Sequence, residues 1–310
     1  MLSLFLLRLY LSMPQSLHAS LERIWLVDAS IFVFRAWFIR NPLPRDTAGH
    51  PVNAVHGFLR FVYHLLQEQK PQYIGFAFDT SLQSSERKAI YPAYKANRSP
   101  APEELKYQFK LCREFLEALG LIQAASTTHE ADDLIGTWAV QQRSPKHQII
   151  IISGDKDLAQ LLHPQDIWWD YNRRGALHAG GIKDSFGVWP EQIADQLAIA
   201  GDKTDNIPGV PGVGMSTAAK LLKRFGSLDN MLANLEQIGS MQVLGAKRLQ
   251  QLITQYQDTI RLARQLTTIN CHVPNLPLDL SRQTKDLVRL QELASLLKLS
   301  QEQYDLWAAI

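Results

Sequence analysis

Three short runs of apolar residues stand out along the chain, at 24–27, 73–78 and 149–152. Each run is followed within three residues by an aspartate: Asp28, Asp79 and Asp155. Continuous β-branched and aromatic runs, separated by longer helical segments, indicate a parallel sheet that is covered on both faces. Because the carboxyl ends of such strands open onto the ligand crevice, we expect the three aspartates to meet at one edge of the sheet.

Apolar residues at helical spacing separate these runs. Residues 55–67 and 105–119 each carry one apolar stripe, which predicts amphipathic helices packed on the sheet. A third helix is predicted to begin near Thr127, which with Glu130 forms a capping box. After residue 186 the pattern is helical, with a Gly/Pro-rich link at 207–214, and the next strand-like run is a weak one near Ile269.

These patterns divide the chain into four parts and place it in the α/β class. We expect a parallel-sheet core of the Rossmann-like type followed by a helical domain. The parts are an extension at 1–22 that is either disordered or the product of a mis-assigned start, a core at 23–185 with a basic helical segment at 84–113, a helical domain at 186–270, and a helical tail at 271–310 that packs back.

The apolar run at 2–11 does not predict a membrane protein. It contains Arg8 and is about half the ~20 residues that a spanning helix needs. The small residues expected before a signal-peptide cleavage site are missing, with Leu17 in their place. The only two cysteines, Cys112 and Cys271, belong to no metal or disulfide pattern. We therefore expect a cytoplasmic protein with no membrane partner.

Nine acidic residues are candidates for one site. Acidic residues in the first turn of a helix are also explained by the helix dipole, so the argument depends on the conjunction of all nine. Gathering so many carboxylates without a counter-ion would cost several kcal/mol. Oxygen-only ligation favours Mg²⁺, with Mn²⁺ as a substitute, and nine acids suit two ions or more. The set is Asp28, Asp79, Glu130, Asp132, Asp133, Asp155, Asp157, Asp202 and Asp205.

The three acids at 130–133 cannot all hold the same ion. On a helix Glu130 and Asp133 share a face, while Asp132 lies about 100° away.

The overall charge is nearly balanced, with 32 basic and 30 acidic residues and a net charge of +2. Between 86 and 113, however, seven basic residues stand against three acidic ones, with Tyr91 and Tyr94 among them. Such a segment is either a solvated helix face or a surface that binds phosphates and stacks bases. Its position after Asp79 favours the second interpretation. The basic residues are Arg87, Lys88, Lys95, Arg98, Lys106, Lys110 and Arg113.

A glycine-rich turn precedes the predicted helix that starts near residue 215. Gly209, Gly212 and Gly214 would let backbone N–H groups approach a phosphate at a helix N-terminus. The sequence does not follow the Walker pattern, because no Gly-Lys-Ser/Thr follows. The outward face of the helix carries Lys220, Lys223 and Arg224.

Together these segments resemble the 5′-nuclease family, which comprises the amino-terminal nuclease domain of bacterial DNA polymerase I, phage flap endonucleases and stand-alone bacterial relatives. The resemblance covers about residues 24–270 and follows the family's order. The matching stretches are Val27-Asp28, Phe78-Asp79, Tyr94-Lys95-Ala96-Asn97-Arg98, Glu130-Ala131-Asp132-Asp133, Ser153-Gly154-Asp155-Lys156-Asp157-Leu158 and the segment 201–210.

The resemblance implies a Mg²⁺-dependent 5′-3′ exonuclease or flap endonuclease that acts near the 5′ end of branched or duplex DNA by a two-metal mechanism. It implies that the nine acids line the metal site and that Lys95, Arg98 and Arg87 lie near the scissile phosphate. The fold that the resemblance implies is a PIN-like or Rossmann-like nuclease core followed by a helical DNA-binding domain of the helix-turn-helix kind. Tyr94 and the segment 209–226 would bind DNA, with a K⁺ ion at the turn 207–214. We expect a monomer without a small-molecule cofactor.

Three alternatives remain at this point. A PIN-type ribonuclease shares the acidic core but lacks the turn at 209–214 and its helix. A catalytically silent DNA-structure binder would keep the acids for stability. A glycosidase needs only two carboxylates and no basic segment.

Overall fold

The computed structural model describes residues 21–39, 43–80, 85–171, 173 and 175–310. Apart from its last two residues, the predicted extension 1–22 lies outside the described residues.

The centre of the fold is a parallel sheet of five strands in the order β3-β2-β1-β4-β5. The strands are β1 (Glu22–Asp28), β2 (Tyr73–Phe78), β3 (Ile122–Ala125), β4 (His147–Ile152) and β5 (Ile167–Trp169). The parallel α/β prediction is therefore confirmed, and the three apolar runs form the three central strands. The sheet order reverses direction between β1 and β4, where a ligand crevice is expected.

The sequence pattern missed one strand and wrongly suggested another, and both errors concern weak patterns. The edge strand β3 was not predicted, because its four residues are mostly half-exposed and include the polar Gln123. The run near Ile269 forms no strand. Ile269 instead packs as a buried apolar residue in the core that joins the sheet to the helical domain.

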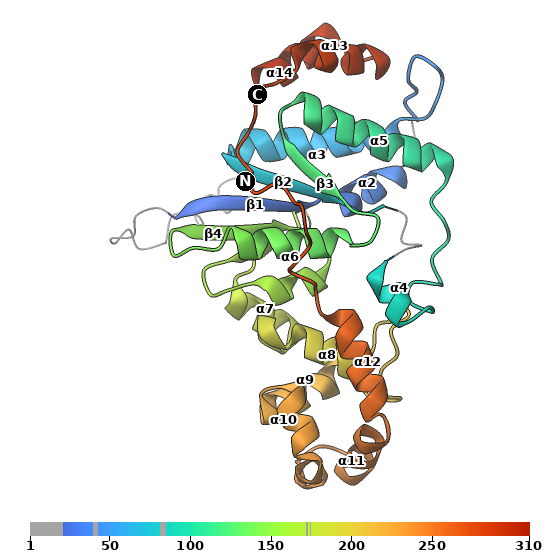
Figure 1. Cartoon of the computed structure of the whole chain (residues 1–310), viewed down its shortest axis with the longest axis vertical. Helices are drawn as coiled ribbons and strands as arrows, with labels where there is room; N and C mark the ends of the chain where they lie inside the picture. The colour runs from blue at the N-terminus through green and yellow to red at the C-terminus, as the bar shows by residue number, and fades with distance from the viewer. Residues whose placement is uncertain (1–20, 40–42, 81–84, 172, 174) are drawn as a thin grey trace, which may run out of the picture.

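Alternate residues of β1 point into two separate cores. Trp25 and Val27 pack under α2 (Ala29–Trp37), α3 (Asn53–Gln69) and α5 (Glu103–Ala118). Ile24 and Leu26 pack on the other face, under α6 (Ala131–Gln141). The helices thus form a layer on each side of the sheet (Figure 1). This alternation is the two-residue period of a buried strand.

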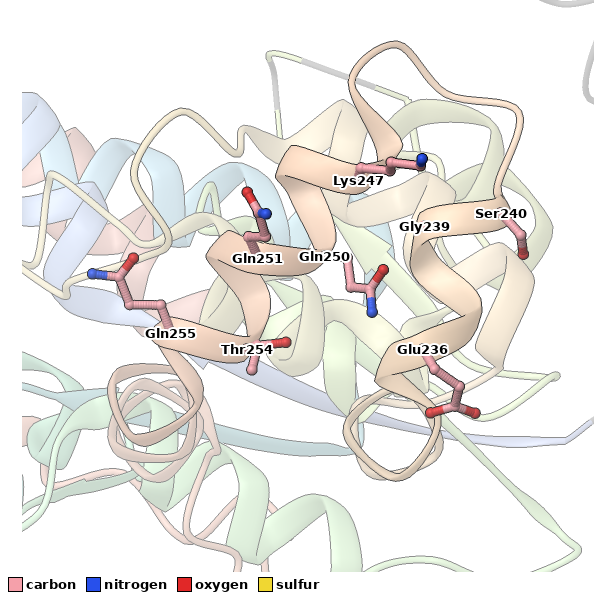
Figure 2. A pocket seen from close by; sticks show the side chains of 8 residues that line it. All are labelled: Glu236, Gly239, Ser240, Lys247, Gln250, Gln251, Thr254 and Gln255. Carbon is pink, nitrogen blue, oxygen red and sulfur yellow. The ribbon is translucent and has the colours of Figure 1, made fainter.

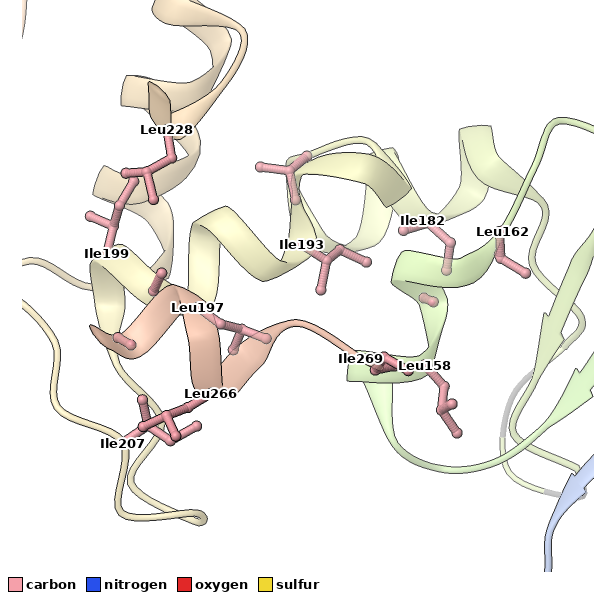
Figure 3. Close-up of a cluster of buried hydrophobic side chains, with 14 of the residues drawn as sticks. Leu158, Leu162, Ile182, Ile193, Leu197, Ile199, Ile207, Leu228, Leu266 and Ile269 are labelled. Carbon is pink, nitrogen blue, oxygen red and sulfur yellow. The ribbon is translucent and has the colours of Figure 1, made fainter. Parts of the chain in front are cut away.

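The second core continues into the helical domain without interruption. Leu158 and Leu162 from the 3₁₀ segment η2 (Lys156–Leu161) and its end join Ile193, Leu197 and Leu266 in one cluster (Figure 3). The helical domain is built from α7 (Ala179–Phe186), η3 (Pro190–Gln192), α8 (Ile193–Ala200), α9 (Met215–Phe225), α10 (Leu228–Ala233), η4 (Leu235–Ser240), α11 (Ala246–Gln255) and α12 (Gln257–Thr267). Shared apolar packing therefore fixes this domain against the sheet edge.

The tail returns to the core and ends on its opposite side (Figure 1). The backbone pairs with β2 where the Ile74 N–H donates to Leu280 O at 2.8 Å. Helices α13 (Leu287–Leu296) and α14 (Gln301–Ala309) follow, and the Trp307 ring packs edge-on against Tyr63 and Phe115.

Helix α6 begins at Ala131, so the predicted start near Thr127 was wrong. The Ser126 hydroxyl accepts the N–H groups of Thr128 and His129, which forms a turn before the helix. Glu130 is the N-cap, and its N–H donates to the Asp133 carboxylate at 3.1 Å.

The basic segment contains two separate helices, α4 (Glu86–Ile90) and α5, with turns between them. In the part of the chain that the structure describes, no helix is both long and apolar enough to cross a membrane.

Candidate active site

Four carboxylates gather at the carboxyl end of the central strands. Asp28 ends β1, Asp79 follows β2, Asp155 follows β4, and Asp132 lies in the first turn of α6. We call these four residues the sheet-edge acids. Asp132 lies close enough to the other three for each of them to raise its pKa. The prediction that the strand ends bring their aspartates to one edge is thereby confirmed.

Mutual repulsion and burial change the acidity of this group. Burial, followed by the charge of Asp79, raises the pKa of Asp28 to about 7. Burial and the charges of Asp155, Asp28 and Asp79 raise the pKa of Asp132 well above its ordinary value. In the described part of the chain, no Lys, Arg or His forms an ion pair with any of the four. The charge of Lys95 opposes this rise at Asp132 without cancelling it, so the described residues balance the sheet-edge acids only in part.

Two serines orient these acids. The Ser153 hydroxyl donates to Asp28 Oδ2 at 2.7 Å and accepts the Asp155 N–H at 2.9 Å. The Ser30 hydroxyl accepts the Asp79 N–H at 2.7 Å, and Asp79 Oδ1 accepts the Ala131 N–H at 2.9 Å. These bonds tie three strand ends and a helix N-terminus into one rigid frame.

A second acidic group comes from η2 and the link before α9. Asp157, Asp202 and Asp205, which we call the outer acids, line a cleft of 360 Å³ together with Asp155 and Lys156. Burial and the charge of Asp155 raise the pKa of Asp157 to about 7. Asp155 therefore lies close to the outer acids as well as to the other three sheet-edge acids.

Glu130 belongs to a third, basic cluster. Its Oε2 atom accepts from Lys95 Nζ at 2.8 Å and from the Tyr94 hydroxyl at 3.0 Å. Lys95 Nζ also lies 3.4 Å from Asp205, to which Arg98 donates as well. Although burial lowers the pKa of Lys95, the charge of Glu130 raises it well above its ordinary value. Lys95 is therefore held as a cation beside the acids, and the half-exposed Arg98 lies at the rim.

Tyr94 is an internal residue in this cluster. Only 2% of it is exposed, and its hydroxyl also lies 3.3 Å from Asp205. Its ring has no exposed face on which DNA could stack, because the polypeptide covers it. The structure thus places Tyr94 away from the DNA contact that the sequence predicts.

Asp133 and Arg87 form a buried ion pair away from the sheet-edge acids. Both terminal nitrogens of the Arg87 guanidinium, Nη1 and Nη2, donate to the Asp133 carboxylate at 2.7 Å. Arg87 also donates to the carbonyls of Leu266 and Thr268, and Asp133 accepts the Asn270 N–H at 2.9 Å. Burial lowers the pKa of Arg87, but its bonds to Asp133 raise it above the ordinary value. The pair joins α4, α6 and the end of α12, and its polar atoms are occupied within the protein.

The glycine-rich turn has the exposed helix start that the sequence predicts. A Cβ on Gly209 would lie 2.3 Å from the backbone of Ala200 and Gly201, so only glycine fits there. Gly212 has a φ of +78°, and Gly214 is the N-cap of α9. One face of α9 presents the exposed side chains of Lys220, Lys223 and Arg224.

The donor set matches a hard divalent cation. The ligand atoms are carboxylate oxygens, and the buried atoms Glu130 Oε1 and Asp157 Oδ1 accept no hydrogen bond. As the described side chains stand, no three Asp, Glu, His or Cys residues are arranged to hold an ion. Small side-chain rotations would therefore accompany binding.

Another groove lies elsewhere, between η4 and α11 of the helical domain (Figure 2). Its volume is 670 Å³, and its lining is mostly amide and hydroxyl side chains, with Glu236 and Lys247 at opposite ends. None of the acids of the candidate site lines it.

Sequence reasoning missed the residues that support the acids. Ser30, Ser153 and Lys156 each lie within two residues of a predicted acid, which is the only signal that could have identified them. The partners of Arg87 on α12 are nearly 180 residues away in the chain, and no local pattern indicates them.

Comparison with known proteins identifies the family. Residues 23–187 match the family model "5'-3' exonuclease, N-terminal resolvase-like domain", and residues 188–292 match "5'-3' exonuclease, C-terminal SAM fold". The 5'-3' exonuclease of Aquifex aeolicus is 36% identical over 70% of this chain and 74% of its own length. DNA polymerase I of Rhizobium leguminosarum is 37% identical over 86% of this chain, which spans 26% of that protein.

Solved structures share the fold at low identity. T5 5'-exonuclease with bound zinc ions has a TM-score of 0.62 at 18% identity and covers 93% of this chain and 97% of its own. The catalytic core of Rad2 in complex with DNA substrate has a TM-score of 0.61 at 16% identity, over 95% and 94% of the two chains. Two family models together span most of the sequence, and the chain therefore belongs to the 5'-3' exonuclease family.

Proposed function

We propose that this chain is a divalent-metal-dependent 5′-3′ exonuclease and flap endonuclease that hydrolyses phosphodiester bonds near the 5′ end of branched or duplex DNA. The observation that carries the proposal is the group of sheet-edge acids. They form no ion pair with a described residue, and they lie beside the cations Lys95 and Arg98. The T5 and Rad2 structures with metal ions or DNA substrate support the same assignment.

The sheet-edge acids would hold one ion, and the outer acids together with Asp155 would hold a second. Mg²⁺ is the expected ion, and Mn²⁺ should replace it. Ions bound there would supply a water of lowered pKa and would neutralise charge on the phosphoryl group. Ser153 would keep Asp28 oriented, because its hydroxyl bonds both the Asp28 carboxylate and the Asp155 N–H, and Ser30 would hold the Asp79 backbone in place.

Lys95 and Arg98 would meet the phosphate that is cut. Lys95 is fixed by Glu130 and Asp205 beside the carboxylates, and the Arg98 side chain is 47% exposed, which leaves room for a phosphate oxygen. Two preorganised cations at this point would stabilise the charge that develops during cleavage. Because Arg87 and Asp133 saturate each other, we assign that pair a structural part in the site.

The helical domain would hold the duplex by its backbone. Backbone N–H groups at the N-terminus of α9 and the exposed Lys220, Lys223 and Arg224 are suited to phosphates. Binding of this kind gives little sequence preference. The logarithm of the binding constant should fall linearly with the logarithm of the salt concentration, with a slope of about 0.9 for each phosphate neutralised. A K⁺ ion at 207–214 and a monomeric state stay predictions.

The metal-free protein should lose stability as pH rises. Asp28 binds a proton near pH 7 in the folded chain but near pH 4 when unfolded, so the folded state holds more protons between these values. From about pH 5 to about pH 7 this group alone should reduce the free energy of unfolding by about 2 kcal/mol. Urea unfolding in EDTA across this range should show the fall.

An Asp28→Asn variant is the control for that pH series. It cannot ionise, so its curve should be flatter than that of the wild type by the same amount. Saturating Mg²⁺ should flatten the wild-type curve as well, because the ion favours the charged carboxylates. If the free energy of unfolding falls with pH equally in the variant and the wild type in EDTA, the raised pKa of Asp28 is not the cause of the fall.

The alternatives meet specific obstacles. A PIN-type ribonuclease has no counterpart to the glycine-rich turn and α9, which this chain contains. A glycosidase would leave most of the acids and the Lys95 cluster without a use. A catalytically silent DNA binder needs the same surfaces as a nuclease, so activity has to be measured to separate the two.

The direct test uses purified protein and 5′-labelled flap, nicked and single-stranded DNA, each with Mg²⁺, with Mn²⁺ or with EDTA. We expect cleavage near the 5′ end of the flap and nicked substrates with either ion and none with EDTA. A matched single-stranded RNA tests the ribonuclease alternative. Absence of cleavage on every DNA with both ions would refute the proposal.

A further inference from the structure

Lys156 lies inside the acidic cleft, between two acids that the proposed mechanism assigns to a metal ion. Its Nζ atom is 3.4 Å from Asp157 Oδ1 and 3.8 Å from Asp202 Oδ2. It follows Asp155 in the chain and also lines the cleft. The ammonium group therefore lies at the centre of the outer half of the site.

The two halves of the site differ in how their charge is balanced. The sheet-edge acids form no ion pair within the described part of the chain. Asp205 is paired with Lys95 and Arg98. For Asp157 and Asp202, the ion pairs in the described structure come from Lys156 alone. Asp157 Oδ1 is buried, and its contact with Lys156 at 3.4 Å is a long one that leaves the carboxylate poorly satisfied.

We propose that Lys156 is a built-in counter-ion that occupies the outer half of the site until a divalent cation displaces it. The sheet-edge acids then bind their ion tightly, because no described lysine or arginine is paired with them, while the outer acids bind theirs more weakly. This inference rests on the proposed function, since it concerns the same metal site.

The geometry allows the displacement. The Lys156 side chain is 40% exposed, and a lysine carries a compact charge on a flexible stem, so it can rotate into solvent without unpacking the core. Lys95, in contrast, is 9% exposed and held by Glu130 and Asp205. Lys156 is thus the cation paired with Asp157 and Asp202 that can leave when an ion arrives.

The test compares divalent-ion binding by the full-length wild type with that of Lys156→Met, which keeps the length of the side chain and removes its charge. Lys156→Arg keeps the charge. Lys106→Met is the matched control, because it removes a lysine paired with Glu103 at 2.6 Å on the exposed face of α5. Calorimetric titration with Mn²⁺, without DNA and at constant ionic strength, resolves the two binding steps.

We expect the wild type to bind one ion tightly and one weakly. In Lys156→Met the weak step should tighten by about tenfold, which corresponds to about 1.4 kcal/mol, and the tight step should stay within about twofold. Lys156→Arg and Lys106→Met should bind like the wild type. A weak step in Lys156→Met that is unchanged or weaker would overturn the inference and leave the nuclease proposal standing. No Mn²⁺ binding by the wild type would overturn both.

Thermal unfolding gives a second readout that a purely structural lysine would not produce. In EDTA, Lys156→Met should melt below the wild type, because Asp157 and Asp202 lose their counter-ion. In saturating Mn²⁺ that difference should disappear, since the ion replaces Lys156. A variant that is destabilised equally in both conditions would show that Lys156 only supports the fold.

Discussion

Replacing Asp155 by asparagine should lower the rate of cleavage of 5′-flap DNA by about a thousandfold and leave the affinity for that DNA within about twofold. Asp155 is a sheet-edge acid that also borders the outer acids, so it is the one carboxylate that both ions would share. A thousandfold loss corresponds to about 4 kcal/mol of transition-state stabilisation, as expected when the ligand of a catalytic ion loses its charge. Single-turnover cleavage in Mg²⁺ and fluorescence anisotropy in Ca²⁺ measure the two quantities.

The asparagine is chosen because it keeps the local structure. Asp155 Oδ1 accepts the Asp157 N–H at 2.9 Å, and an amide oxygen can accept the same bond. Asp184→Asn is the matched control, since Asp184 is exposed on α7 away from the cleft, and it should cleave like the wild type. Cleavage by Asp155→Asn within tenfold of the wild type would remove Asp155 from the metal site. If the wild type never cleaves, and binds the DNA as tightly as Asp155→Asn does, the silent-binder alternative is favoured.

The sheet and its edge could be predicted because their signals are local. An apolar run that ends in an aspartate predicts a buried strand and also places a carboxylate at the carboxyl end of that strand, as at Val27-Asp28 and Phe78-Asp79. The rest of the edge follows from parallel pairing. Weak edge strands escape this logic, and β3 was missed because its residues are only partly buried.

The division of labour among the acids could not be predicted. Asp132 and Asp133 are neighbours of the same residue type, and their helical positions indicate only that they face different directions. Which direction leads to the sheet edge and which to Arg87 depends on contacts made by α4 and the end of α12. Tyr94 gives the same lesson, because a tyrosine within a basic segment has the pattern of a stacking residue until tertiary packing buries it.

Asp132→Asn and Asp133→Asn should change the stability of the metal-free protein in opposite directions. Asp133→Asn leaves the buried Arg87 guanidinium without its carboxylate, which should reduce the free energy of unfolding by about 3–5 kcal/mol. Asp132→Asn removes the cost of burying a carboxylate and its repulsion by Asp155, Asp28 and Asp79, and should raise the free energy of unfolding near neutral pH. Urea unfolding in EDTA measures both. The double variant Arg87→Met/Asp133→Leu should recover only part of the loss, because the carbonyls of Leu266 and Thr268 and the N–H groups of Glu130 and Asn270 lose their side-chain partners. Destabilisation by both single substitutions would mean that Asp132, like Asp133, serves the fold, and it would leave the sheet-edge acids without the repulsion on which the metal site depends.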